Sequence, residues 1–126
     1  MLEVALVCLA SAIYHEARGE PLLGQMAVAE VIINRVDNWR WKNTVCEVVT
    51  QKDQFTFYWD GKSDKMIDHE ARRLAERVAT SYLVGGNAGI TKGATCYTRV
   101  EINNYWTKKS TVIMTIGKHK FMDCTT

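Results

Sequence analysis

Glu16 is the residue of this sequence whose surroundings best suit acid chemistry. Residues 1–13 carry a single charge, at Glu3, and predict a buried helix that ends near Ala17 or Arg18. In its last turn, the negative end of the helix dipole and partial burial both raise the pKa of the Glu16 carboxyl. A carboxyl that keeps its proton near neutral pH can protonate a glycosidic leaving oxygen. An ion pair between Glu16 and Arg18 is the competing interpretation of the same spacing.

The histidines do not form a zinc motif. His15-Glu16 and His69-Glu70 resemble the start of H-E-x-x-H, but position 19 is Gly and position 73 is Arg. A zinc site could also combine His15, His69 and His119 with the cysteines, but the spacing of these residues in the sequence matches no known zinc-binding pattern. We therefore predict no metal and no other cofactor.

Motifs spread over nearly the whole chain carry a resemblance to a known family. They are Ile13-Tyr14-His15-Glu16-Ala17-Arg18-Gly19-Glu20-Pro21, Gly24-Gln25, Ala27-Val28-Ala29, Asn34-Arg35-Val36, Asn43-Thr44-Val45-Cys46, Val48-Val49, Gln54-Phe55, Ala94-Thr95, Tyr97, Trp106, Ile116-Gly117, His119 and Phe121. With these motifs the chain resembles the cell-wall hydrolase family typified by the spore-cortex lytic enzyme SleB. Two positions depart from the family pattern, because Cys96 stands where His is frequent and Met122 where an aromatic residue is frequent.

The resemblance implies a lysozyme-like domain that cuts the glycan strands of peptidoglycan, with Glu16 of the E-A-R-G-E motif as catalytic acid. A conventional glycosidase needs a second carboxylate, and none of the candidates Glu20, Glu30 and Asp60 stands out. A lytic transglycosylase needs only one, because the 6-hydroxyl of N-acetylmuramic acid is the nucleophile and a 1,6-anhydro sugar is the product. We therefore expect cleavage of the β-1,4 bond between N-acetylmuramic acid and N-acetylglucosamine by this route.

Three other functions compete with this interpretation. They are a hydrolytic muramidase, a zinc-dependent N-acetylmuramoyl-alanine amidase, and a non-catalytic module that binds the cell wall through its aromatic residues.

Several polar and aromatic residues are candidates for substrate binding. Gln54 can hydrogen-bond an N-acetyl or hydroxyl group, and the aromatic rings that could stack on sugars are Phe55, Tyr58, Tyr97 and Trp106. Asn34 and Arg35 are expected to shape the turn after the second helix. His119 is expected in a turn between strands, in a structural role.

The elements that must position these residues are mainly helical. We expect a first helix that ends at Ala17 or Arg18 with Gly19 as its C-cap, a second helix over Leu23–Val36, and a short helix from Thr44 to Val49. A loop or short strand follows over Gln51–Gly61, and then a helix from Asp64 to Leu83 that is ended by Gly85-Gly86. Strands are expected at Ala94–Thr98 and Thr111–Thr115, with Gly117 in a turn. The predicted fold class is α+β, mainly helical, with a small antiparallel β element.

The inward faces of the two longer helices follow from their apolar spacing. The stripes are Leu22, Met26, Ala29, Ile33 and Val36 in one helix and Ile67, Ala71, Leu74, Val78 and Tyr82 in the other. Asp68 and Arg72 are expected to form an ion pair on the outer face.

Length and composition predict a single domain over residues 1–126. The 126 residues suffice for one hydrophobic core, and 47% hydrophobic with 24% charged residues is ordinary globular composition that excludes disorder. The net charge of +2 suits an anionic polymer such as the cell wall but predicts no binding to nucleic acid. No segment is long and apolar enough to span a bilayer, and we expect a monomer.

The N-terminal residues and the cysteines provide evidence about the cellular compartment of the protein. Ala10-Ser11-Ala12 imitates a signal-peptidase site, but no basic residue precedes Arg18, so no export signal is predicted. We expect a phage endolysin that stays in the host cytoplasm until lysis and then acts on the cell wall. In a reducing cytoplasm the four cysteines are expected as free thiols, and their spacing alone leaves three pairings open if they oxidise.

Overall fold

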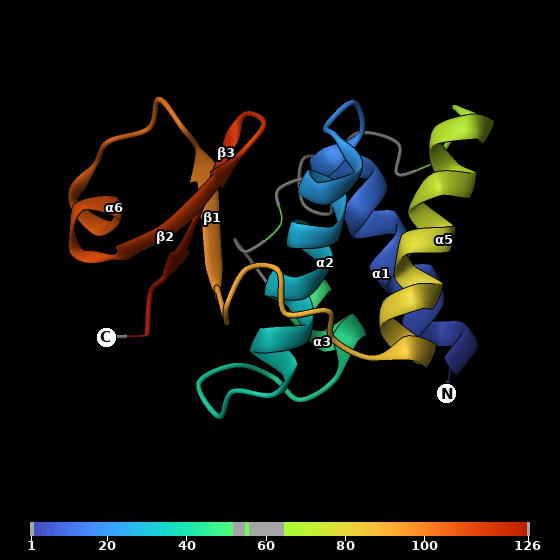
Figure 1. Ribbon diagram of the computed structural model, residues 1–126. Coiled ribbons are helices and arrows are strands. Elements are labelled where there is room, and N and C mark those ends of the chain that lie inside the picture. Colours follow the sequence, from blue (N-terminus) through green and yellow to red (C-terminus); the bar gives the residue numbers. More distant parts are fainter. Residues whose placement is uncertain (1, 52–54, 56–64, 126) are drawn as a thin grey trace.

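The computed structural model describes residues 2–51, 55 and 65–125. Helices pack together on one side of the molecule, and a three-stranded sheet with a short helix lies on the other (Figure 1). In chain order the elements are α1 (Leu2–Ala17), α2 (Leu22–Val36), α3 (Val45–Thr50), α5 (His69–Gly85), β1 (Cys96–Arg99), α6 (Tyr105–Lys109), β2 (Thr111–Ile116) and β3 (His119–Asp123). No helix in the described part of the chain is long and apolar enough to cross a membrane.

The end of α1 is set by a glycine turn, as predicted. Gly19 has a φ of 89°, a left-handed conformation that a residue without Cβ adopts at little cost. The amide of Arg18 donates to the Tyr14 carbonyl at 3.1 Å, and the amide of Glu20 donates to the Ala17 carbonyl at 2.9 Å. The last turn of the helix, which carries Glu16, is therefore closed by backbone hydrogen bonds and followed by a glycine turn.

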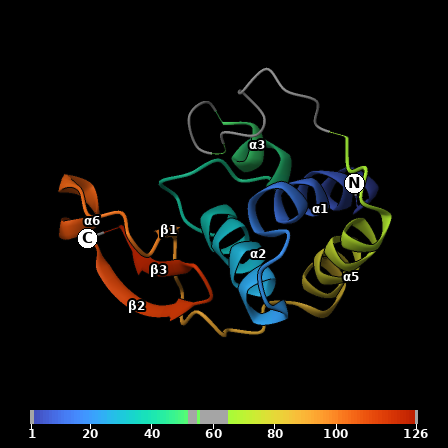
Figure 2. The same ribbon diagram turned by 90° about the horizontal axis from the view of Figure 1, so that it is seen from above.

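The central helix α2 differs from its predicted pattern. Figure 2 shows it between the sheet and α1, and it also packs against α3 and α5. It is therefore buried on most of its circumference, and Val28, Val31 and Ile32 are fully buried although they lie outside the predicted stripe. Leu22, which was expected to point inward, is 52% exposed. A single apolar stripe describes a helix with one covered face, which α2 is not.

Helix α5 begins later than predicted. Its N-cap is Asp68, whose side chain accepts a hydrogen bond from the amide of Ala71 at 3.1 Å. The predicted cap, Asp64, lies outside the described residues, and Ile67 precedes the helix and is 76% exposed instead of inward-facing. Asp64 and Asp68 can both serve as N-caps, so the sequence alone did not determine where the helix begins.

The rest of α5 follows the prediction more closely. Val78 and Tyr82 are buried, and the helix ends at Gly85 with Gly86 at a φ of 86°. Arg72 does not pair with Asp68, which caps the helix, and instead lies 4.0 Å from Glu76.

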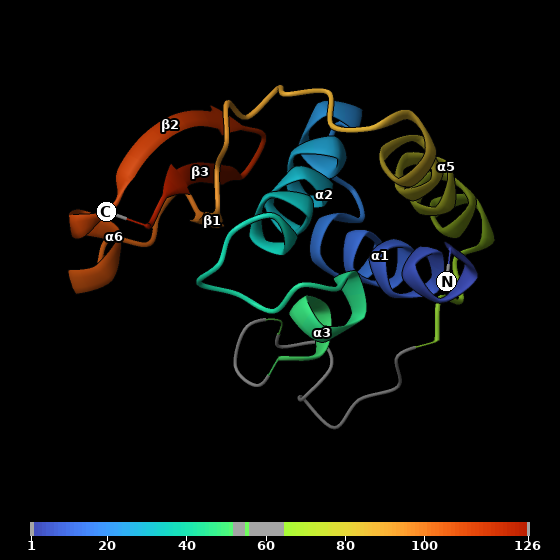
Figure 3. The same cartoon turned by 90° about the horizontal axis from the view of Figure 1, so that it is seen from below.

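The sheet contains β3 besides the two strands whose positions were predicted. Its order is β1-β3-β2, with antiparallel pairs throughout, so that Tyr97 lies opposite Phe121 and Arg99 opposite His119. Gly117 lies in the turn between β2 and β3, as predicted. His119 is the first residue of β3 and not part of that turn. The short helix α6 was not predicted, and it lies beyond the sheet from the other helices (Figure 3).

Two disulfides correct the expectation of free thiols. Cys8 bonds to Cys46 and joins α1 to α3, while Cys96 bonds to Cys124 and joins β1 to the C-terminal segment. None of the four cysteines is free. The sequence could not reveal these pairs because the bonded cysteines are 38 and 28 residues apart and only the tertiary structure brings them together.

Reduction of the disulfides is expected to destabilise the fold. A bridge that closes a loop of this length restricts the unfolded chain, and its loss costs roughly 3–4 kcal/mol. We expect dithiothreitol to lower the Tm by roughly 10 °C or more, as measured by thermal unfolding in parallel samples. Titration of the unfolded, unreduced chain that finds four thiols would contradict the pairing.

Candidate active site

Glu16 lies where the helices meet the sheet. Its carboxylate projects from the last turn of α1, and the hydroxyl of Tyr97 on β1 donates a hydrogen bond to Glu16 Oε1 at 2.5 Å. The two residues are far apart in the sequence, and both side chains are partly buried. The contact holds Oε1 of the carboxyl in place.

The environment of Glu16 favours its protonated form, in agreement with the sequence-based expectation. Burial raises the pKa of the Glu16 carboxyl and is the largest influence on it. The hydrogen bond from Tyr97 and the charges of His15 and Arg35 lower the pKa and only partly offset burial. The group can therefore hold a proton and also be stabilised as the anion after losing it, which is what an acid that later acts as a base requires.

Arg18 does not form the ion pair with Glu16 that the competing interpretation of the sequence predicted. Its guanidinium donates to the Tyr14 hydroxyl at 2.5 Å and lies 4.7 Å above that ring. Tyr14 and Arg18 are four residues apart and share a helix face, whereas Glu16 projects from a different one. The cation that acts on Glu16 from another element is Arg35.

Arg35 is a buried cation, for which sequence analysis predicted only a role in shaping the turn after the second helix. Its Nε donates to the Thr95 carbonyl at 2.7 Å, and its guanidinium lies 5.4 Å from the ring of Trp41 and 5.5 Å from that of Phe55. Burial lowers the pKa of Arg35, and the nearby Tyr97 and Glu16 raise it. The sequence did contain a signal for this role, namely a charged residue in the mostly apolar helix α2. A cation buried there needs anionic or carbonyl partners, and Glu16 could have been considered as one of them.

His119 contacts the same tyrosine from the neighbouring strand. The rings of His119 and Tyr97 are 5.0 Å apart in an edge-to-face arrangement, and Phe121 packs on Tyr97 at 5.7 Å. Nδ1 of His119 lies 3.6 Å from Glu20 Oε1. Burial lowers the pKa of His119, and the charge of Glu20 opposes this. His119 therefore supports Tyr97, which agrees with a structural role.

The two candidate second carboxylates that the structure describes are both engaged elsewhere. Glu20 accepts a hydrogen bond from the amide of Lys118 at 2.9 Å and so holds the turn between β2 and β3. Glu30 is fully buried and accepts hydrogen bonds from Tyr82, Ile90 and Thr91. The third candidate, Asp60, lies outside the described residues.

The predicted substrate-binding residues do not all gather at Glu16. Tyr97 does, through its hydroxyl. Phe55 is 1% exposed, so its ring packs in the core and offers no face to a sugar. Trp106 is 42% exposed on α6, beyond the sheet from the helices (Figure 1). Gln54 and Tyr58 lie outside the described residues.

Loss of the Tyr97 hydroxyl is expected to shift the pH dependence of activity. The hydroxyl stabilises the Glu16 carboxylate and lowers its pKa, so Tyr97→Phe raises that pKa and moves the basic limb of the pH–rate profile to higher pH. We expect the maximal rate to fall about tenfold, because the carboxyl also loses its positioning contact. Tyr105→Phe, on the exposed surface, is the control. A basic limb that stays in place or moves to lower pH would contradict this role.

Comparisons with known proteins agree with this architecture. The family model described as cell wall hydrolase matches residues 19–122, a match that begins just after Glu16. The spore cortex-lytic enzyme of Bacillus cereus is 36% identical over 113 residues, and that of Halalkalibacterium halodurans is 35% identical over 114 residues. Each alignment covers 90% of this chain but only 42% and 33% of the respective relative. The chain therefore spans less than half the length of these curated relatives.

Two solved structures share the fold. The catalytic domain of the Bacillus cereus SleB protein matches with a TM-score of 0.79 at 32% identity, covering 94% of this chain and 89% of that one. The catalytic domain of the germination-specific lytic transglycosylase SleB from Bacillus anthracis matches with a TM-score of 0.78 at 33% identity, covering 94% and 93%. The predicted fold, mainly helical with a small antiparallel sheet, is confirmed.

Proposed function

This chain belongs to the cell wall hydrolase family, and from that membership we propose that it cleaves peptidoglycan glycan strands as a lytic transglycosylase. The bond cut is the β-1,4 linkage between N-acetylmuramic acid and N-acetylglucosamine. The proposal rests on the environment of the Glu16 carboxyl. This group is partly buried, accepts a hydrogen bond from Tyr97, and has its pKa lowered by the positive charge of Arg35.

The proposed reaction uses Glu16 twice. In its protonated form Glu16 donates its proton to the oxygen that leaves with N-acetylglucosamine, and the bond from that oxygen to C1 of the muramic acid breaks. The carboxylate then accepts the proton of the muramic 6-hydroxyl, whose oxygen bonds to C1 of the same sugar. Glu16 is restored to its protonated form, and no water is consumed. The nucleophile belongs to the substrate, and its high effective concentration lowers the barrier to ring closure.

The state between the two proton transfers explains the neighbours of Glu16. Once Glu16 has lost its proton, the carboxylate is stabilised by the Tyr97 hydroxyl and by the charge of Arg35. Arg35 is itself fixed by the Thr95 carbonyl, so it needs little reorganisation when the charge develops.

A single catalytic carboxyl favours this route over hydrolysis by a muramidase. Hydrolysis requires a second carboxylate, either to activate water or to form a covalent intermediate. In the described part of the chain, Glu20 accepts a hydrogen bond from the amide of Lys118 in a turn. The buried carboxylate of Glu30 accepts hydrogen bonds on both of its oxygens from Tyr82 and Thr91. Neither is free to serve as partner to Glu16.

A metal-independent lytic activity is expected. The disulfides bind all four sulfurs, which removes them as thiolate ligands, and within the described ranges no three His, Cys, Asp or Glu residues gather as a ligand set. We therefore expect the turbidity of a peptidoglycan suspension to fall at the same rate with and without EDTA. Loss of activity with EDTA and its recovery with added zinc would favour the amidase. Binding to the wall without any clearing would favour the non-catalytic module.

The biological setting that we propose is lysis of a bacterial host by a phage endolysin. Its two disulfides suit a protein that works outside the reducing cytoplasm, after the membrane has been opened. A holin gene next to the coding sequence is the expected genome context. Neighbouring sporulation or germination genes would favour a role in the spore cortex instead.

A further inference from the structure

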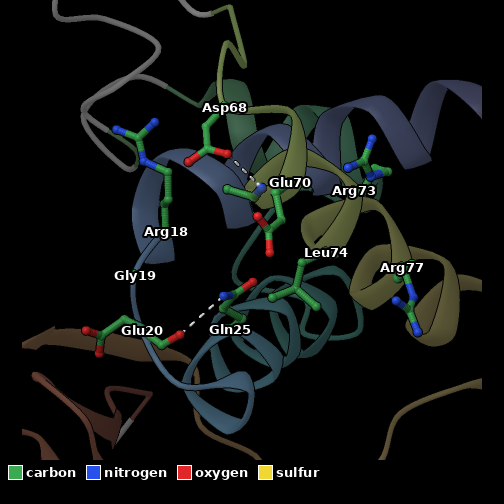
Figure 4. A pocket seen from close by; sticks show the side chains of 10 residues that line it. Arg18, Gly19, Glu20, Gln25, Asp68, Glu70, Arg73, Leu74 and Arg77 are labelled. Atoms are coloured by element: carbon green, nitrogen blue, oxygen red, sulfur yellow. Dashed lines mark hydrogen bonds between the residues drawn. The ribbon is translucent and has the colours of Figure 1, made fainter.

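A cleft of about 530 Å³ lies next to the catalytic helix end (Figure 4). The turn after α1 and the start of α2 form one side of it, and the N-terminal half of α5 forms the other. The side chains that matter for its chemistry are Arg18, Gln25, Glu70, Arg73, Leu74 and Arg77. The mechanism proposed for Glu16 uses none of them.

The two sides of this cleft are held together by the hydroxyl of Tyr14. That oxygen accepts a hydrogen bond from Arg18 at 2.5 Å and another from the backbone amide of Asp68 at 3.0 Å. Asp68 in turn caps α5 through the amide of Ala71. The end of α1 and the beginning of α5 are therefore fixed relative to each other, so the cleft is formed before any ligand binds.

The interior of the cleft combines an amide, a carboxylate and an apolar side chain. Figure 4 shows Gln25, Glu70 and Leu74 pointing toward one another. Gln25 is only 6% exposed, and its Nε2 donates to the Glu20 carbonyl at 3.2 Å, which fixes the orientation of the amide.

The charged side chains of the cleft are not joined to one another by ion pairs within the described residues. Arg73 and Arg77 follow Glu70 on α5, yet no ion pair in the described part of the chain joins Glu70 to either arginine. Cationic and anionic groups thus remain separate around one cavity. Such an arrangement suits an extended ligand that carries both an ammonium group and carboxylates.

We propose that this cleft binds the stem peptide of peptidoglycan, an inference that rests on the proposed function. The stem is attached to the lactyl group of muramic acid and carries carboxylates, peptide groups, alanine methyl groups and the amino group of a diamino acid. Glu70 takes the ammonium group, Arg73 takes a carboxylate, and Gln25 hydrogen-bonds a peptide group. The side chain of Leu74 packs on an alanine methyl group.

The stem is about as long as a helix is wide, so it can extend past the end of α1. Glu16 reaches β1, whereas Tyr14 and Arg18 face α5, so a ligand must pass the end of α1 to reach both places. A helix with its side chains is about 10–12 Å across. Three extended residues span roughly 10 Å, and the lactyl group adds to this reach. An N-acetyl group alone is too short.

Binding of the isolated stem tests the site independently of catalysis. We would titrate L-alanyl-γ-D-glutamyl-meso-diaminopimelate into the full chain and follow backbone amide shifts by NMR. We expect shifts at Gln25 and from Glu70 to Leu74, and about tenfold weaker binding in Glu70→Gln. Glu76→Gln, an isosteric change further along α5, is the control and is expected to bind as the wild type does. No shifts at these positions, or equal weakening by both variants, would overturn the proposal.

Cleavage of two substrates tests whether the cleft serves the enzyme. Peptidoglycan with intact stems is compared with strands from which an amidase has removed them. We expect the wild type to cleave the stem-bearing strands faster, and Glu70→Gln to lower the ratio of the two rates about tenfold while Glu76→Gln preserves it. An unchanged ratio in Glu70→Gln would refute the role of the cleft in the enzyme. If neither strand is cleaved, the proposed function fails, and the titration alone decides whether the cleft binds the stem.

Discussion

Replacement of Glu16 by glutamine is expected to abolish cleavage of peptidoglycan while leaving the fold intact. The amide has nearly the shape of the carboxyl, and its oxygen can still accept the hydrogen bond from Tyr97. It cannot donate a proton as an acid does, and it cannot take one back from the muramic hydroxyl. General acid–base catalysis by one group contributes roughly 10²–10⁴-fold, and because Glu16 serves both steps we expect a loss of several orders of magnitude. The initial rate of clearing of purified peptidoglycan measures it.

Glu20→Gln is the matched control for this variant. Glu20 lies in the same motif, and its Oε1 accepts from the amide of Lys118, a contact that glutamine can keep. Only a mild loss of activity is expected. A greater loss in Glu20→Gln than in Glu16→Gln would show that the catalytic carboxyl is Glu20. A folded Glu16→Gln protein that clears peptidoglycan at nearly the wild-type rate would refute the role of Glu16.

Replacement of Glu30 by glutamine is expected to destabilise the fold more than any other isosteric change discussed. The buried carboxylate accepts four hydrogen bonds, from the Tyr82 hydroxyl at 2.6 Å, the Ile90 amide at 2.9 Å, and the Thr91 amide and hydroxyl at 2.9 and 2.7 Å. In glutamine one acceptor becomes an NH₂ group that faces donors, which leaves buried groups unpaired. Hydrogen bonds to a charged group contribute roughly 1.5–3 kcal/mol each and two of them are lost, a cost of roughly 3–6 kcal/mol, so we expect the Tm to fall by roughly 10–20 °C.

The pH dependence of stability gives a second test of Glu30. Burial raises the pKa of its carboxyl, but the hydrogen bonds from Tyr82, Thr91 and Ile90 outweigh burial and hold the pKa below its usual value. A lowered pKa in the folded state means that the stabilisation is present above the pKa of the unfolded chain and is lost as the pH falls. The wild type should therefore lose more stability on acidification than Glu30→Gln does. Thermal unfolding across acidic pH checks this, with Glu76→Gln as the exposed control. Equal losses in Glu30→Gln and the wild type would contradict it.

Local signals in the sequence predicted the parts of the fold that depend on neighbouring residues. Gly19 ends α1, Thr44 caps α3 and Gly86 ends α5, because each acts on backbone groups within one turn of itself. The position of Glu16 in the last turn of α1 followed from the same reasoning. So did the direction of its pKa shift, since burial and the helix end belong to that helix.

Long-range partners were beyond this reasoning. Part of the positive charge that lowers the pKa of Glu16 comes from Arg35, and two of the residues that donate to Glu30 lie about 60 residues away. The same limit applies to the disulfide pairs and to strand β3, whose place in the centre of the sheet depends on β1 and β2. Periodicity identifies a face of an element but not what covers it, and this is also why the pattern of α2 was misjudged.

The mass of the fragments released from purified peptidoglycan tests the central claim most directly. If Glu16 acts as the single catalytic carboxyl, the muramic 6-hydroxyl closes onto its own anomeric carbon. The muropeptides are then lighter by one water than hydrolysed ones and have no reducing muramic end, and mass spectrometry before and after borohydride reduction distinguishes the two. We predict 1,6-anhydro-muramic ends that borohydride does not alter. Reducing muramic ends of full mass would contradict the account and point to a hydrolase with a second carboxylate.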